Sequence, residues 1–338
     1  SLAKLKDTKS LNDVVAQLNS LNDSDPALRH ACIMYLASTV DAAKLETLSR
    51  HNNPSVRRVA VVALRRLRAS ELATFLSDEN ELVVLEAARA IHDQPVPVAM
   101  NALAAMIDEV QGSEELIRRV LNANFRLGSE ESAAKLAEYA ERISAPPAMR
   151  VEALNMLANW AKPDPRDRVL NAHRPLPERD ATVARMALTP QVDSLMTAEA
   201  SVRERTIEVA SGLGIKKIAP RLVQRVNNIE LTPEVRSTAL AALNRLDPAK
   251  AVMLAKNVKL LPATELLPQA LRVLAEHSPK DSMPKFVEAT ESRSMEVRQL
   301  AWDILAASQH PQAASAIAKG VQGYLDSTLT GDVHLNVL

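Results

Sequence analysis

A short sequence pattern recurs along the whole chain, and this repetition constrains the fold more than any other feature. Segments such as NPSVRRVAVVALRRL and PEVRSTALAALNRL share a polar or proline start, an apolar residue usually followed by arginine, an alanine three residues later, and an Ala-Leu pair or its equivalent. The arginine position is occupied in turn by Arg29, Arg57, Val84, Arg118, Arg150, Arg203, Arg236, Leu267, Arg298 and His334. These positions lie 27 to 36 residues apart, except for one spacing of 53. Such a period is typical of stacked supersecondary units.

Each copy of the pattern predicts an amphipathic helix. In the second copy one apolar stripe with helical spacing comprises Val56, Val59, Ala60, Ala63, Leu64 and Leu67. The pairs Asp25-Pro26, Asn53-Pro54 and Thr232-Pro233 place a capping side chain before a proline in the first helical turn. A second, looser apolar segment such as ESAAKLAEYAERI follows each helix. Each unit is therefore expected to be a helix pair, which buries its apolar face only by stacking on its neighbours.

Composition supports an all-α fold. Aromatic residues make up only 2% of the 338 residues and there are only seven glycines, so the apolar residues are mostly those that suit close helix packing. The pattern resembles short HEAT repeats, and the resemblance covers essentially the whole chain. It implies a single α-α superhelix of the armadillo/HEAT type over residues 1–338, with about nine to ten two-helix repeats. The tetratricopeptide and ankyrin signatures are absent from the sequence.

The recurring arginines would form a ladder along one edge of the stack. The ladder comprises Arg29, Arg57, Arg118, Arg150, Arg203, Arg236 and Arg298. One interpretation is structural, with each guanidinium donating hydrogen bonds to carbonyls or to an Asp or Asn of the adjacent repeat. The alternative is a row of cations that binds phosphates or an acidic partner.

Motifs that carry chemistry are not found in the sequence. The seven histidines show no metal-ligand spacing, and no Gly-x-Ser-x-Gly elbow occurs. The single cysteine, Cys32, lies on an apolar helix stripe and is expected to be a core thiol. The sequence therefore predicts a non-catalytic segment without catalytic, cofactor-binding or metal-binding residues. Zero net charge disfavours nucleic acid as a partner, and no apolar run is long enough to span a membrane. We expect a monomer.

The spacing of 53 residues contains a proline-rich insert, residues 159–180, predicted to lie between two repeats. Its four prolines exclude a continuous helix. Arginines alternate with acidic residues in it, which predicts an ordered loop. The candidate interaction residues are Trp160, Arg166, Asp167, Arg168, Arg174 and Arg179. The insert is expected either to dock a neighbour, which would be a flanking domain or a protein partner, or to cover a seam between repeats.

The insert also carries a more specific resemblance. The motif W-A-K-P-x-P-R-D-R-V…R-P-L…R-D resembles the HEAT segment of large membrane-bound dehydrogenases of planctomycetes and verrucomicrobia. In that family a sugar-dehydrogenase-like β-propeller precedes the repeats and a c-type cytochrome domain follows them. The resemblance implies a spacer within a longer periplasmic, secreted or membrane-associated oxidoreductase, with haem c in a downstream domain. It transfers no catalytic or haem-binding residue to this chain.

Two alternative functions stay open at this point. The chain could be a free-standing adaptor for a protein or peptide partner. It could also be an enzyme similar to the bilin lyases, which use HEAT-like repeats, although the scarcity of aromatic residues to stack on a tetrapyrrole argues against this.

Overall fold

The computed structural model of the chain describes residues 9–21, 24–258 and 266–337. In this part of the chain the regular elements are α-helices and short 3₁₀ helices, and the only β pairing is an isolated bridge between Arg166 and His173. The predicted all-α architecture of stacked helix pairs is confirmed. The chain divides into two compact units, Ser1–Thr206 and Ile207–Leu338. The single solenoid domain expected over residues 1–338 stays a prediction.

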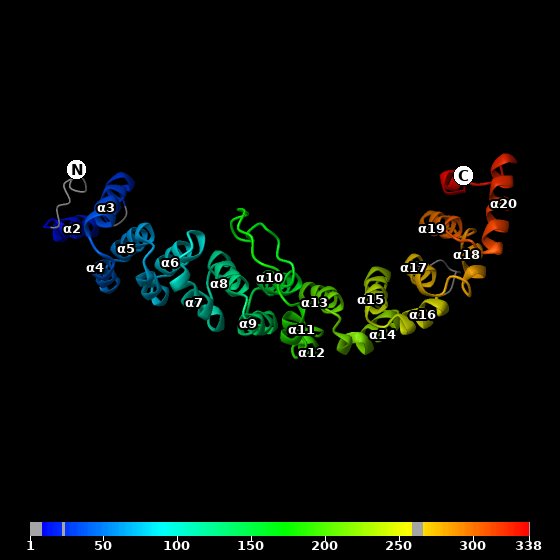
Figure 1. The fold of residues 1–338 in the computed structure, drawn as a ribbon, viewed down its shortest axis with the longest axis horizontal. Coiled ribbons are helices and arrows are strands. Elements are labelled where there is room, and N and C mark those ends of the chain that lie inside the picture. Colours follow the sequence, from blue (N-terminus) through cyan, green and yellow to red (C-terminus); the bar gives the residue numbers. More distant parts are fainter. Residues whose placement is uncertain (1–8, 22–23, 259–265, 338) are drawn as a thin grey trace. The chain divides into compact units, whose positions relative to one another are not determined.

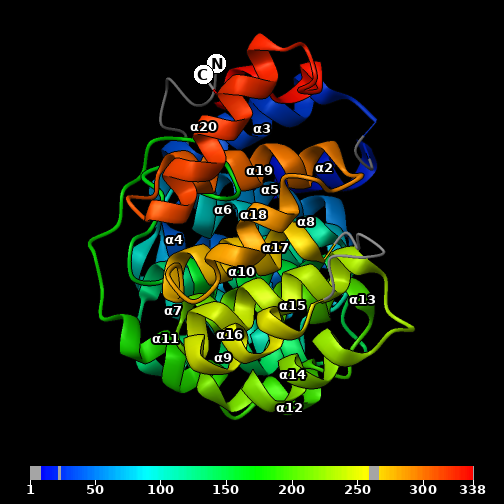
Figure 2. The same cartoon turned by 90° about the vertical axis from the view of Figure 1, so that its right-hand side faces the viewer.

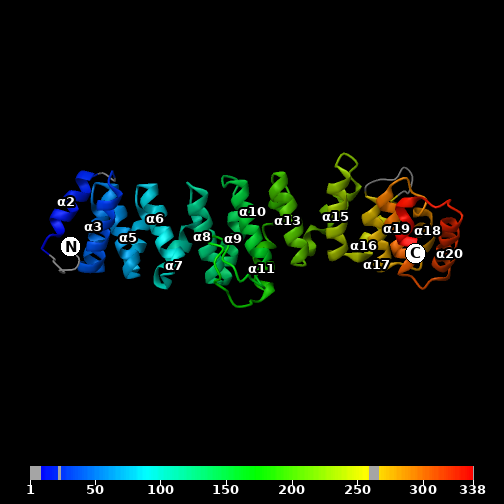
Figure 3. The same ribbon diagram turned by 90° about the horizontal axis from the view of Figure 1, so that it is seen from above.

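Unit 1 consists of two layers of helices (Figure 1). The first layer contains α3 (Pro26–Thr39), α5 (Pro54–Leu67), α6 (Glu81–Asp93), α8 (Glu114–Leu127) and α10 (Pro147–Ala158), preceded by α2 (Leu11–Leu21). The second layer contains α4 (Ala42–Glu46), η1 (Thr47–Arg50), η2 (Ser70–Ser77), α7 (Pro97–Ala105), η3 (Met106–Asp108), α9 (Glu130–Glu141), α11 (Ala181–Leu188) and α12 (Val192–Leu195). Viewed from above, the first-layer helices stand side by side in one row (Figure 3).

Unit 2 repeats this arrangement. Its first-layer helices are α15 (Pro233–Leu246), α17 (Leu267–His277), α19 (Met295–Ala306) and the short α21 (His334–Val337). Its second layer contains η4 (Lys216–Ile218), α14 (Ala219–Asn227), α16 (Pro248–Asn257), α18 (Met283–Ala289) and α20 (Pro311–Leu325), and η5 (Gly331–Val333) leads into α21. Helices α15, α17 and α19 follow one another through the unit (Figure 2). Helix α13 (Ala200–Gly212) contains the boundary between the units.

The apolar stripes form the core as their spacing predicts. In α5 the residues Val56, Ala60, Ala63 and Leu64 are fully buried. Leu67 is 40% exposed, because the helix ends there and Arg68 adopts a left-handed conformation with φ +53°. Truncating a fully buried leucine such as Leu64 lowers the free energy of unfolding by about 2–5 kcal/mol. Because α5 packs against α3 and α6 of the adjacent repeats, each repeat depends on its neighbours for stability.

Two of the three predicted caps form. The Asn53 side chain accepts a hydrogen bond from the Ser55 amide at 2.8 Å, and Asp25 accepts from the Ala27 amide at 2.9 Å. Thr232 precedes α15 without a side-chain capping bond. Cys32 is buried in α3, and burial raises the pKa of its thiol.

The insert lies within a repeat. It leaves the first-layer helix α10 and returns to α11, which packs against α9 as the second-layer partner of that repeat. The sequence placed the insert between two repeats because spacing between successive arginines gives the length of an insertion but not the loop that holds it.

Candidate functional site: the docked insert and its buried ion network

The insert folds into a compact hairpin. The Arg179 amide donates to the Ala161 carbonyl at 2.9 Å, which brings the two ends of the insert together. Further along, the Arg174 amide donates to the Pro165 carbonyl at 2.9 Å, and the Asp167 amide donates to the Ala172 carbonyl at 2.8 Å. The hairpin lies along one edge of the row of first-layer helices (Figure 3). These bonds give a proline-rich segment a fixed shape without a helix or a sheet.

A cluster of aromatic rings and one cation anchors the base of the insert. Trp160 is 1% exposed and meets the Phe125 ring of α8 edge to face, with ring centroids 6.0 Å apart. The Arg179 guanidinium lies over both rings, 4.8 Å from the Trp160 centroid and 5.1 Å from the Phe125 centroid. Aromatic pairs and desolvated cation–π contacts each contribute about 0.5–2 kcal/mol. Trp160 is therefore an anchor within unit 1.

Arginines of the insert cap the carboxyl ends of two first-layer helices. Arg179 donates from Nη1 to the Phe125 carbonyl in the last turn of α8 at 2.7 Å, and Arg174 donates from Nη2 to the His92 carbonyl in the last turn of α6 at 3.1 Å. The last four carbonyls of a helix lack partners within the helix, and cations are favoured at this end by the helix dipole. The insert thus supplies hydrogen-bond donors to carbonyl groups at the ends of two adjacent helices.

A glycine makes room for this cap. Gly128 ends α8 with φ +71°, and a Cβ atom on it would lie 2.7 Å from Cζ of Arg179. Glycine suits the backbone conformation of this position, and a Cβ atom there would have to displace the Arg179 guanidinium from its contacts with the Phe125 carbonyl and the two rings.

Asp167 is the buried centre of the insert. Its Oδ1 accepts from the amides of Val169 at 2.9 Å and Leu170 at 3.0 Å. Its Oδ2 lies 3.0 Å from Nη1 of Arg126 in α8 and 3.2 Å from Nη1 of Arg174. Burial alone would raise the pKa of this carboxyl, but the two amides and the surrounding cations outweigh burial and lower it. The same site lowers the pKa of Arg126, through burial and the neighbouring Arg174.

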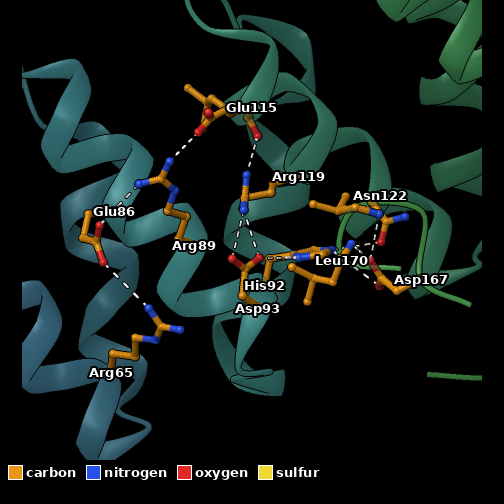
Figure 4. A network of polar contacts seen from close by, with 12 residues as sticks. Arg65, Glu86, Arg89, His92, Asp93, Glu115, Arg119, Asn122, Asp167 and Leu170 are labelled. Carbon is orange, nitrogen blue, oxygen red and sulfur yellow. Dashed lines mark hydrogen bonds and ion pairs between the residues drawn. The ribbon is translucent and has the colours of Figure 1, made fainter. Parts of the chain in front are cut away.

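Polar contacts extend from Asp167 through the buried His92 side chain to residues of α6 and α8 (Figure 4). Nε2 of His92 lies 3.9 Å from Oδ2 of Asp167 and 2.9 Å from Oδ1 of Asn122, while Nδ1 lies 2.9 Å from Oδ1 of Asp93. Arg119 donates to both carboxylate oxygens of Asp93 at 3.0 and 2.9 Å. Burial would raise the pKa of Asp93, but the bonds from His92 and Arg119 outweigh it and lower the value to about 2. A polar network thus joins α6, α8 and the insert.

The insert also reaches α10. Arg168 donates to both oxygens of the buried Glu152 carboxylate at 2.7 and 2.8 Å. This bidentate bond raises the pKa of Arg168. With the contacts described above, the insert is fixed to α6, α8 and α10, which belong to three successive repeats.

Five of the six candidate interaction residues are thus engaged inside unit 1. Trp160, Asp167, Arg168, Arg174 and Arg179 all contact helices of the unit. Arg166 is the exception, since it is exposed and donates only within the insert, to the Asn171 carbonyl at 2.9 Å. These contacts favour the interpretation that the insert covers a seam over the interpretation that it projects toward a neighbour.

The arginine ladder makes structural contacts in most repeats. Arg57, Arg150 and Arg298 are paired with a carboxylate just before or at the start of the next first-layer helix. The pairs are Arg57 Nε to Asp78 at 2.7 Å, Arg150 Nη1 to Glu199 at 3.0 Å, and Arg298 Nε to Asp332 at 3.1 Å. Several members also donate to carbonyls that precede their own helix, including Arg57 to His51 at 2.8 Å, Arg150 to Ala140 at 2.7 Å, Arg203 to Ala198 at 3.0 Å and Arg236 to Val226 at 2.8 Å. Arg29 is half-buried in α3.

Arg118 departs from the ladder. It is partly exposed and lies 3.7 Å from Glu114 on the surface of α8, whereas the next residue, Arg119, turns inward to Asp93. The N-cap of α8 is Ser113, so the position equivalent to Arg57 is occupied by Ile117. Successive residues of a helix point about 100° apart. Arg118 therefore faces the surface of α8, while the next residue, Arg119, faces Asp93 of α6.

Sequence patterns did not identify the helix residues that receive the insert. His92, Asp93, Arg126 and Glu152 carry no motif, and the Arg174–His92 bond joins residues 82 positions apart. On the surface beside the network, Arg65, Glu86, Arg89 and Glu115 form a chain of ion pairs across α5, α6 and α8 (Figure 4). Of these pairs, Arg89–Glu115 is the most exposed, and an exposed ion pair contributes about 0–1 kcal/mol.

Neither a metal site nor a membrane span is found in the part of the chain that the structure describes. Among residues 9–21, 24–258 and 266–337 no group of three or more His, Cys, Asp or Glu side chains is arranged to hold a metal ion. Within the same ranges no helix is both long and apolar enough to cross a membrane.

Comparisons with known proteins give structural similarity only. No protein-family model matches the chain, and no curated protein matches it. An engineered protein of known structure shares 17% identity over 99% of this chain and 96% of its own, with a TM-score of 0.42. A chain from a structure of Kap95p with RanGDP shares 13% identity over 98% of this chain, with a TM-score of 0.38, and this chain covers 56% of it. The assignment to stacked helical repeats rests on the helices of this chain itself.

Proposed function

We propose that this chain is a non-catalytic scaffold for protein interaction, in which the insert is a brace that makes unit 1 rigid. The observation that carries the proposal is the docking of one segment on three successive repeats, through the capped ends of α6 and α8 and the Arg168–Glu152 pair on α10. Repeats in a stack otherwise contact only their nearest neighbours. A brace across three of them resists bending between them.

The chemistry of the contacts supports a structural role. The Asp167 carboxylate is fully buried and paired with two arginines, and breaking a buried pair by removing one partner costs about 3–5 kcal/mol. Such an arrangement holds one conformation and leaves few side chains of the insert free to bind a partner.

The finer proposal is that the scaffold separates a sugar-dehydrogenase-like β-propeller from a c-type cytochrome domain in a periplasmic or secreted protein. Its support is the resemblance of the insert motif. The motif residues Trp160, Asp167, Arg168, Arg174 and Arg179 are the ones that the brace uses. Proteins of that family that carry the same motif would therefore be expected to fold this segment into the same brace.

Rigidity is measured with two spin labels on the second layer of unit 1. Cysteines replace the exposed Val98 in α7 and Met186 in α11, in a Cys32→Ala background. Double electron–electron resonance should give one narrow distance distribution, which Asp167→Asn broadens. Arg166→Ala is the matched control and should leave the distribution unchanged. An equally narrow distribution in the Asp167→Asn variant would refute the brace.

The finer proposal has a separate test. In the natural gene, a Cys-x-x-Cys-His haem-attachment motif encoded downstream of the codon for residue 338 supports the spacer role. A gene without such a motif overturns it, and the brace proposal is unaffected by that outcome.

A further inference from the structure

An open groove lies in unit 2 between the carboxyl ends of α17 and α19. It has a volume of about 940 Å³, and its lining includes Ala275, Met283, Phe286, Asp303 and Ala307. Met283 and Phe286 of α18 are themselves buried and form an apolar floor, while Asp303 and Ala307 are exposed. The groove therefore combines apolar surface with one carboxylate.

The groove occupies the same place in the repeat as the docking site of the insert in unit 1. Helices α8 and α19 have N-caps Ser113 and Ser294. Counting nine residues from each cap pairs Asn122 with Asp303, and counting thirteen pairs Arg126 with Ala307.

Helices α6 and α17 extend the correspondence. Their buried positions align when Ile91 is paired with Leu274, and this alignment pairs His92 with Ala275. In unit 1, His92, Asn122 and Arg126 surround Asp167 of the insert, so the groove is the counterpart of that site. Small side chains replace the imidazole and the guanidinium.

Two carbonyls at these helix ends resemble those that arginines cap in unit 1: that of the lining residue Ala275, and that of Ala306, which directly precedes the lining residue Ala307. The Ala275 carbonyl corresponds to that of His92, and the residue four positions on is Pro279, which has no N–H. The Ala306 carbonyl corresponds to that of Phe125, and the residue four positions on, His310, donates its amide to the Ser308 hydroxyl at 3.1 Å. Neither carbonyl can accept its usual helical bond, so each is a suitable acceptor for a guanidinium.

The negative charge of Asp303 favours a basic group of the occupant beside it. Asp303 stands where unit 1 has the neutral Asn122, and its Oδ1 accepts from Nδ2 of Asn336 at 2.7 Å. Two helix carboxyl ends add partial negative charge. The cationic Lys280 and the imidazole of His310 also line the groove.

We propose that this groove binds an extended, proline-containing and arginine-rich peptide segment of a partner protein. The insert in unit 1 is the internal precedent for this mode of binding: an extended chain whose arginines cap two neighbouring helix ends. In the groove an arginine takes the place that Asp167 has in unit 1, because Asp303 replaces Asn122 and the two alanines leave space for a longer side chain. The inference rests on the proposed function, since it names one partner chemistry for the scaffold.

The probe is a fluorescein-labelled peptide of residues 161–179 that carries Asp167→Arg, and the measurement is its fluorescence anisotropy with the full chain. The peptide should bind, and the same peptide with Asp167 retained should bind about tenfold more weakly because of repulsion from Asp303. Ala307→Arg fills the groove and should weaken binding at least about tenfold; Asp303→Asn removes only the charge and should weaken it several-fold.

Met253→Arg is the matched control, because it adds the same charge on an exposed position of α16 outside the groove lining. It should leave binding unchanged, and circular dichroism should show that every variant keeps its helices. Absence of binding at about millimolar peptide, or binding that both Ala307→Arg and Asp303→Asn leave unchanged, overturns the proposal. The spin-label experiment on unit 1 is independent of this result, so a failure of the groove and a failure of the brace are distinguishable.

Discussion

Asp167→Asn is the most informative single change in this chain. Asparagine has nearly the same shape, and its Oδ1 can still accept from the amides of Val169 and Leu170. The amide nitrogen then replaces Oδ2, which faces Arg126 at 3.0 Å and Arg174 at 3.2 Å. The substitution therefore removes the negative charge and leaves two cations close together in a buried site.

The expected loss follows from this geometry. The Asp167 side chain is fully buried, and the Arg126 and Arg174 side chains are 17% and 15% exposed, so water screens the remaining cations poorly. Removing one partner of a buried ion pair costs about 3–5 kcal/mol. With a urea m value of about 2 kcal/mol/M, the unfolding midpoint of unit 1 should fall by about 1.5–2.5 M.

Tryptophan fluorescence measures this loss in unit 1. Trp160 and Trp302 are the only tryptophans, so a Trp302→Phe background makes Trp160 the single reporter, and it lies next to the insert. Urea titrations of Asp167→Asn, Arg126→Gln and the double variant complete a mutant cycle. The double variant should be destabilised by at least about 1 kcal/mol less than the sum of the single variants.

Arg166→Ala is the control, since this exposed arginine of the same hairpin should change stability by no more than about 0.5 kcal/mol. A midpoint shift for Asp167→Asn below about 0.5 M would show that desolvation of the buried charges cancels their attraction. In that case the network would not stabilise the brace.

Three further predictions concern unit 1, one of them by comparison with Gly214 of unit 2. Arg119→Ala should cost about 2–3 kcal/mol by leaving the partly buried Asp93 carboxylate without its bidentate partner. Arg118→Ala should cost at most about 0.5 kcal/mol, and urea titration of both variants compares the two directly. Gly128→Ala should lower the free energy of unfolding by about 1–2 kcal/mol more than Gly214→Ala, measured by thermal or urea unfolding. Both glycines have nearly the same positive φ, but only at Gly128 would the new Cβ lie close to another group, 2.7 Å from Cζ of Arg179. The pKa of Asp93 is lowered to about 2 from 3.8, so the contribution of this carboxylate should be complete above pH 4 and lost as the pH falls toward 2. Asp93→Asn should therefore reduce the fall in the free energy of unfolding between pH 4 and pH 2 by about 2 kcal/mol. The same fall in the variant as in the unmodified protein would contradict this account.

The sequence was sufficient for the elements of the fold. Apolar periodicity in α5 predicted the buried side chains except at Leu67, which is exposed at the end of the helix, and Asn53-Pro54 marked where that helix begins. This succeeds because helix formation and the choice of a buried face depend on residues within a turn or two of one another. Regular spacing then predicted the stack, and a single long spacing revealed the insert.

Tertiary structure decided what the insert contacts. Asp167 meets Arg126 across 41 positions and Arg174 meets His92 across 82. No periodic signal relates residues so far apart, because their proximity depends on how three repeats stack. Local patterns therefore identified Trp160 and the arginines as candidates, but they could not show that Arg168, Arg174 and Arg179 contact helices of unit 1 whereas Arg166 stays exposed.

The same distinction explains Arg118 and the groove of unit 2. Whether Arg118 or Arg119 turns inward depends on the rotation of α8 against α6, which its cap and packing fix. The correspondence between His92 and Ala275 appears only after the helices are aligned by their buried faces. The sequence by itself determined a stack of helix pairs with one ordered insertion. Only the tertiary structure decided that the insert fills the site at the ends of α6 and α8, while the corresponding groove at the ends of α17 and α19 is open. The reason is that burial and pairing of charges depend on groups that folding brings together.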